Sequence, residues 1–131
     1  MPHARTLLLL ALLTAGCASP NPDVPASLED IAVPPQYERY DDSETKSYYE
    51  KHEKFRSARI SYRGRTDACD PAAFYQRQMP NDGWKLEDAT PGANKGECKL
   101  TYVKELERAR IWVTPSNNDM TSVTIEIGYN K

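Results

Sequence analysis

The stretch Ser57–Pro80, SARISYRGRTDACDPAAFYQRQMP, decides the fold because a strand pattern runs straight into a helix pattern. At its start, Ala58, Ile60 and Tyr62 alternate with polar residues. This period of two is typical of a strand with one buried and one solvent-facing side. The residues from Gly64 to Cys69 then turn the chain, so we expect the compact part of the protein to begin with this strand.

A helix is predicted after the turn. Asp70-Pro71 marks its start, since Asp is a favoured N-cap residue and Pro suits the first helical position. Pro80 ends it, and Asn81-Asp82-Gly83 is a typical turn. One face of this helix carries apolar or aromatic side chains at helical spacing, namely Ala72, Tyr75 and Met79, with Phe74 on the flank.

Four short alternating runs complete the chain. Their alternating apolar members are Trp84 and Leu86; Cys98, Leu100 and Tyr102; Ala109, Ile111 and Val113; and Val123, Ile125, Ile127 and Tyr129. A loop at Thr90–Gly96 and a turn at Pro115–Asp119 separate some of these runs. The sequence therefore predicts an α+β domain with one helix packed on a largely antiparallel sheet of about five strands, in the order β-α-β-β-β-β.

The N-terminus reads as a secretion signal. Arg5 supplies a positive charge, Leu7–Leu13 is a short apolar run, and small residues lead to Cys17. The run is too short to span a bilayer, which takes about 20 residues. The sequence LTAGC at Leu13–Cys17 resembles the lipobox of bacterial lipoproteins, with Thr14 where that family usually has a large aliphatic residue.

This resemblance implies that residues 1–16 are removed as a signal peptide and that Cys17 is acylated as the new first residue. Ala18 resembles the residues that permit sorting to the outer membrane, on its periplasmic side, in a cell with two membranes. The run Phe74–Trp84, with its FY, MP and GW pairs, is also similar to small, uncharacterised domains of bacterial lipoproteins. That second likeness implies no activity and no site residues.

A proline-rich segment follows the anchor. Ala18–Gln36 contains five prolines and few bulky apolar residues, so it buries too little to offset the entropy of ordering it. We therefore predict an extended linker that rises about 3.1 Å per residue. The lipid anchor and linker are assigned to residues 17–44, and the small α+β domain to residues 45–131.

The segment Gln36–Arg56 is ambiguous. Asp42 could cap a short helix over Ser43–Lys54. Such a helix would place several rings on one face: Tyr48, His52 and Phe55, with Tyr49 beside them. An aromatic stripe of this kind usually docks on the protein's own domain.

Composition and charge exclude one class of partner. Without Arg5 the mature chain has 16 basic and 19 acidic side chains, a formal balance of −3. Proteins that bind nucleic acid usually carry a concentrated basic surface, so we expect no nucleic-acid partner. A domain of under about 90 residues buries a modest area and benefits from a covalent link.

Two cysteines could supply that link. Cys69 and Cys98 remain once Cys17 is assigned to lipid, and in an exported, oxidising compartment they most simply form a disulfide. It would close a loop of about 30 residues and add roughly 3–4 kcal/mol of stability. A metal site and a reactive thiol are the alternatives. Because there is no CxxC spacing and His52 is the single mature histidine, we expect no metal.

No motif indicates catalysis. A hydrolase needs a nucleophile, a base and an orienting acid, but His52 lies before the compact domain and no GxSxG pattern accompanies it. Paired carboxylates could perform acid–base work. The candidates stand at alternating or loop positions that usually face solvent: Glu87, Glu105, Glu107 and Glu126. Phosphate-loop, dinucleotide-binding and calcium-loop patterns are absent, so we expect neither an enzyme nor a cofactor.

Trp112 does not fit the core pattern. Its neighbours Ile111 and Val113 have the alternation of inward residues, so Trp112 should lie on the opposite face together with Arg110. The polar side of the first strand adds Arg59 and Arg63.

Two interpretations follow for this face. The one we favour is that the segment containing Tyr48, Tyr49 and Phe55 folds over Trp112 and buries it. The other is that Trp112, with the three arginines, forms a partner surface, since aromatic residues beside arginine are common at interfaces.

The sequence thus predicts a lipid-anchored cell-envelope protein whose small, non-catalytic domain binds a protein or cell-wall partner. A structural accessory subunit of an envelope assembly and a small hydrolase are the alternatives.

Overall fold

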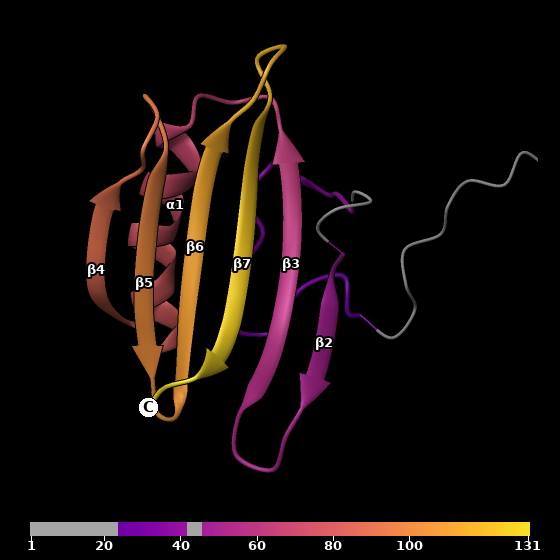
Figure 1. The fold of residues 1–131 in the computed structure, drawn as a ribbon, viewed down its shortest axis with the longest axis vertical. Coiled ribbons are helices and arrows are strands. Elements are labelled where there is room, and N and C mark those ends of the chain that lie inside the picture. The colour runs from indigo at the N-terminus through magenta and orange to yellow at the C-terminus, as the bar shows by residue number, and fades with distance from the viewer. Residues whose placement is uncertain (1–23, 42–45) are drawn as a thin grey trace, which may run out of the picture.

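The computed structural model describes residues 24–41 and 46–131. Within these ranges, seven strands form one antiparallel sheet and one α-helix covers a face of it (Figure 1). The elements are β1 (Glu38–Arg39), β2 (Tyr48–Lys51), β3 (Arg56–Gly64), α1 (Cys69–Gln78), the 3₁₀ turn η1 (Met79–Asp82), β4 (Lys85–Pro91), β5 (Cys98–Lys104), β6 (Glu107–Pro115) and β7 (Thr121–Tyr129). The predicted α+β class, with one helix on a largely antiparallel sheet, is confirmed.

The sheet has more strands than the five expected. Its order is β1-β3-β7-β6-β5-β4, and β2 also pairs with β3, so β1 and β2 share one edge of β3. The five predicted strands correspond to β3, β4, β5, β6 and β7. The two additional strands lie in the segment that had been assigned to the linker and to a short helix.

Alternation along the long strands builds the core. In β7, Val123, Ile125 and Ile127 are at most 2% exposed, while the residues between them are partly exposed. Ile125 is paired with Ile60 of β3 on one side and with Ile111 of β6 on the other. Full burial of each such side chain contributes about 1.5–3 kcal/mol, so this inner face drives the fold.

Helix α1 packs on that inner face through fully buried Tyr75. It begins two residues earlier than predicted, at Cys69 and not at Pro71, and Asp70 is not its cap. Instead the Asp67 carboxylate accepts a hydrogen bond of 2.9 Å from the Cys69 backbone N–H. After η1 the chain turns at Gly83, whose φ of 86° suits a residue without a Cβ. Trp84 directly follows this turn and packs in the core, where it is 2% exposed.

The predicted linker is wrong from residue 24 onward. Residues 24–37, which we call the N-terminal strap, pack on the same face of the sheet as α1. The strap buries four apolar side chains to 8% exposure or less, namely Val24, Leu28, Ile31 and Tyr37. The Tyr62 hydroxyl donates to the Ala26 carbonyl at 3.0 Å, which ties the strap to β3. The domain therefore includes residues 24–41, and its predicted start at residue 45 is wrong.

Four charged side chains hold the strap in place. Arg56 of β3 donates to both oxygens of Asp30, at 2.8 and 3.1 Å, and Lys104 of β5 donates to the same carboxylate at 2.9 Å. Arg56 also pairs with Glu107 at 2.6 Å, so two cations meet two anions. Burial alone would raise the pKa of Asp30, but the hydrogen bonds from Arg56 and Lys104 lower it below its ordinary value.

The short helix over Ser43–Lys54 is also wrong in its described part. Residues 42–45 lie outside the described ranges, and Tyr48–Lys51 form a strand paired with β3. Because side chains alternate along a strand, the two adjacent tyrosines point to opposite faces of the sheet. Tyr49 faces inward and packs against the core, while Tyr48 faces outward and is 42% exposed.

Candidate partner-binding face

The outer face of the sheet is the side away from α1 and the strap. No described element packs over it, as Figure 1 shows. The register places all four predicted surface residues on this face, with Trp112 and Arg110 on β6 and Arg59 and Arg63 on β3. Strand β7 runs between these two strands, so the residues form one continuous surface across three strands.

Trp112 is partly exposed at the centre of this face. Its neighbours in register are Lys99 of β5 and Thr124 of β7. The Lys99 ammonium lies over the indole ring, 5.7 Å from its centroid, at the distance of a cation–π contact. One face of the ring is therefore occupied by a cation of the same chain.

Positive charge is in excess around the indole. Glu126 of β7 is paired in register with both Arg59 and Arg110. Arg59 donates to the Glu126 carboxylate at 2.6 Å, and that contact partly neutralises both groups. Arg110 is exposed and forms no ion pair with any described residue. Two cations thus remain next to Trp112: Lys99, its neighbour on β5, and Arg110, two residues away along β6.

Arg63 is held differently. Its guanidinium lies 3.6 Å from the centroid of the Tyr40 ring, in a stacked cation–π arrangement. It extends the basic surface toward β1, while its position is fixed by the tyrosine. We define the outer-face patch as Trp112, Lys99 and Arg110, with Arg59 and Arg63 at its margin.

The favoured interpretation, in which an aromatic segment covers Trp112, is wrong. Tyr48 and Tyr49 belong to β2, which is separated from β6 by β3 and β7. Phe55 stacks on His52, with ring centroids 4.4 Å apart, at the hairpin between β2 and β3. All three rings therefore lie at the edge of the sheet, away from Trp112.

His52 has a polar environment that deserves comparison with a catalytic triad. Its Nε2 lies 3.1 Å from the Ser57 hydroxyl and 3.6 Å from the Glu50 carboxylate. In a Ser–His–acid triad the two ring nitrogens contact different partners, so that one takes the proton from serine while the other is held by the acid. Here a single ring nitrogen, Nε2, lies near both groups on an exposed hairpin. The arrangement therefore differs from that of a catalytic triad.

The two remaining cysteines come together. Cys69 begins α1, Cys98 begins β5, and both line a hollow of about 400 Å³ between the helix and the β4–β5 hairpin. Both are free thiols in the structure. Their disulfide stays a prediction, and its two partners are placed at one site.

Neither thiol is activated as a nucleophile. A hydrogen bond to Asp67 raises the pKa of Cys69, and burial raises the pKa of Cys98. Reactive cysteines need a lowered pKa to form the thiolate. The reactive-thiol alternative therefore has no support from the surroundings of either cysteine.

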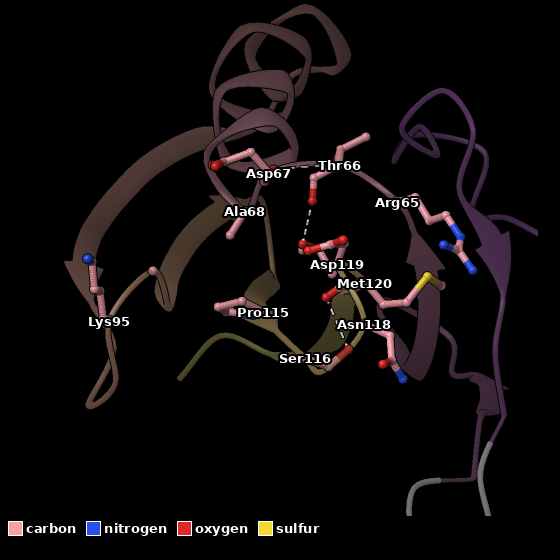
Figure 2. Close-up of a pocket in the computed structure, with 12 residues that line it drawn as sticks. Arg65, Thr66, Asp67, Ala68, Lys95, Pro115, Ser116, Asn118, Asp119 and Met120 are labelled. Atoms are coloured by element: carbon pink, nitrogen blue, oxygen red, sulfur yellow. Dashed lines mark hydrogen bonds between the residues drawn. The ribbon is translucent and has the colours of Figure 1, made fainter.

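A second pocket lies where three loops meet, at the end of the sheet near the start of α1. It measures about 660 Å³ and combines two acidic with two basic side chains, Asp67 and Asp119 with Arg65 and Lys95 (Figure 2). The Asp67 carboxylate already accepts the Cys69 N–H, which lowers its pKa. Across residues 24–41 and 46–131, no three metal-binding side chains are grouped as a cation site would require.

Two important sets of residues were missed from the sequence. Lys99 lies between Cys98 and Leu100, so alternation alone indicates the outer face. Its contact with Trp112 depends on β5 pairing with β6 in that register. No local sequence pattern indicated the ion pairs of Asp30, because its partners lie 26 and 74 residues away along the chain.

Cys17 lies outside the described residues, and its lipidation stays a prediction. None of the helices in the described ranges is long and apolar enough to cross a membrane. Comparisons with models of protein families, with curated proteins and with solved structures found no match to this chain.

Proposed function

We propose that this is a lipid-anchored protein of the cell envelope, and that the outer-face patch of its small, non-catalytic domain binds an acidic partner protein. In a cell with two membranes, its place would be the periplasmic side of the outer membrane. The observation that carries the proposal is the partly exposed Trp112, next to two cations on a sheet face that no described element covers.

The chemistry of the patch favours an acidic partner. Aromatic residues and arginine are enriched at protein interfaces, and tryptophan and arginine often contribute most of the binding energy. Lys99 and Arg110 would meet carboxylates, since Glu126, the acidic residue paired in register with Arg110, is already engaged by Arg59. Complementary charge of this kind guides encounter and selects among partners.

The same geometry argues against a cell-wall glycan as the partner. A sugar that stacks on an aromatic platform needs a free face of the ring. Lys99 already lies over one face of the Trp112 indole, at 5.7 Å from its centroid. A protein partner can instead contact the edge of the ring and the surrounding cations.

The test is capture of a partner with the full mature protein, crosslinked chemically in intact envelope membranes before they are solubilised. We expect Trp112→Ala and Arg110→Glu to reduce capture at least tenfold, since losing one hot-spot side chain costs about 2 kcal/mol or more. Lys85→Glu is the matched control, because it reverses a charge on the same face but on β4, two strands from β6, which carries Trp112 and Arg110. Equal capture by all variants, or retention on purified cell-wall glycan that depends on Trp112, would contradict an acidic protein partner.

A further inference from the structure

The position of Val24 limits how far the outer-face patch can stand from the membrane. Val24 is 5% exposed, and its carbonyl accepts a hydrogen bond of 3.0 Å from Arg39 Nη1 on β1. The Pro25 carbonyl accepts a second hydrogen bond from the same atom at 3.2 Å. The chain is therefore part of the domain from Val24 onward, and only the residues between Cys17 and Val24 separate the domain from the lipid.

The reach of that tether is short. From Cys17 to Val24 there are seven residue steps, and a fully extended chain spans at most about 3.6 Å per residue, or about 25 Å in all. Trp112 on β6 lies three strands from β1 in the sheet order. At about 4.8 Å per strand this adds about 14 Å. Val24 and Trp112 lie on opposite faces of the sheet, which adds about 10 Å, so the patch stays within about 50 Å of the lipid even when the tether is fully extended.

The patch itself is modest. It offers one partly exposed indole and two cations on the uncovered outer face of the sheet. So few anchor residues make a small interface, and small interfaces usually bind weakly, so this patch alone would bind weakly in solution. A short tether changes that balance, because it raises the effective concentration of a nearby partner to the millimolar range.

We infer that the partner is a protein of the same membrane, which presents an acidic surface to the outer face of the sheet within reach of the tether. This inference rests on the proposed function, since it assigns a location to the partner of that same patch. A weak patch on a short tether suits a partner that is confined to the same surface. It does not suit a partner that must be captured from solution or reached at a distance.

The test is photo-crosslinking in intact cells with a tether of variable length. A photoreactive phenylalanine replaces Thr114, an exposed residue on the outer face of β6 and two positions from Trp112. Three full-length chains are compared: the native tether, a tether with a 30-residue Gly-Ser segment inserted after Ser19, and a control with the same segment added after Lys131. Thermal unfolding of each chain checks that the domain is unchanged.

We expect the native chain to crosslink to a membrane protein. Because the tether limits the height of the patch above the membrane, and that height grows with roughly the square root of the tether length, the longer tether should lower the yield by about twofold. The chain extended after Lys131 should crosslink as the native chain does. A yield that rises with the longer tether would place the partner beyond the native reach and overturn the inference. A crosslink to a soluble protein or to glycan would do the same.

These outcomes are separate from failure of the proposed function. If Trp112→Ala and Arg110→Glu leave every crosslink unchanged, the patch does not bind and the proposed function itself is wrong. If mass spectrometry finds Cys17 without lipid in the mature protein, both proposals fall. If crosslinking to the partner requires Trp112 but its yield is the same with both tether lengths, the proposed binding by the patch is supported. The inference that the partner belongs to the same membrane is then wrong.

Discussion

Asp30→Asn tests whether the N-terminal strap is held by its charge cluster. The carboxylate accepts three hydrogen bonds from Arg56 and Lys104, and its side chain is 19% exposed. The variant keeps the size of the side chain, but it removes the negative charge and places an amide N–H₂ among donors. Arg56 retains Glu107, and Lys104 retains the Asp82 carbonyl at 2.8 Å, so no cation is left without a partner.

The expected loss follows from these contacts. A hydrogen bond to a charged group contributes about 1.5–3 kcal/mol to the free energy of unfolding. The loss is smaller than the sum of three such bonds, because Arg56 and Lys104 each keep another partner. We therefore expect the free energy of unfolding to fall by about 2 kcal/mol. For a domain of this size, that corresponds to a drop in the melting temperature of about 8–16 °C.

The measurement is urea and thermal unfolding of the mature, unlipidated chain. Glu29→Gln is the matched control, because it removes the charge of the exposed neighbouring residue. A loss no larger than that of the control, below about 0.5 kcal/mol, would identify the contacts of Asp30 as ordinary surface ion pairs. In that case the strap would be held by its apolar residues alone.

Three further outcomes are expected. The stability that the Asp30 carboxylate contributes should be fully present above pH 3.8, the ordinary pKa of the group. It should decline as the pH falls through the lower pKa of Asp30 in the folded state. The unfolding curves of the wild type and Asp30→Asn should therefore converge in acid. Cys69 and Cys98 should both resist thiol labelling in denatured, unreduced protein from the envelope, and replacing both with Ala should cost roughly 3–4 kcal/mol; quantitative labelling of both would exclude the disulfide. Cys17→Ser should abolish acylation and detergent partitioning, and a native protein that retains Met1 would contradict the anchor.

Regular periodicity made most of the sheet predictable. In β7 every second residue from Val123 to Ile127 is buried, so a single run of sequence carried both the strand and its orientation. The same alternation placed Trp112 on the outer face. What could cover Trp112 depended instead on strand order, because β3 and β7 separate the aromatic segment from β6.

The strap was missed because its apolar spacing does not match the structure that it forms. Val24, Leu28 and Ile31 stand at the i, i+4 and i+7 spacing of a helix face, but the segment forms no helix, and Tyr37 lies beyond the Pro34-Pro35 pair, so the local pattern does not indicate the burial that is observed. Their burial depends on the groove between α1 and β3, and on the charges of Arg56 and Lys104 that meet Asp30. Contacts over such sequence distances leave no local signal.

Strand β4 has a consequence for how copies of this protein meet. It ends the sheet, and all seven of its residues are exposed, including Leu86 at 44%. An open edge of this kind can pair with the same edge of another molecule, and crowding on a surface would favour that association. The strand is irregular between Leu86 and Asp88, has charged side chains, and ends in Pro91, which offers no N–H. These features interrupt the ladder that a second chain would need, so neighbouring copies should remain separate at high density.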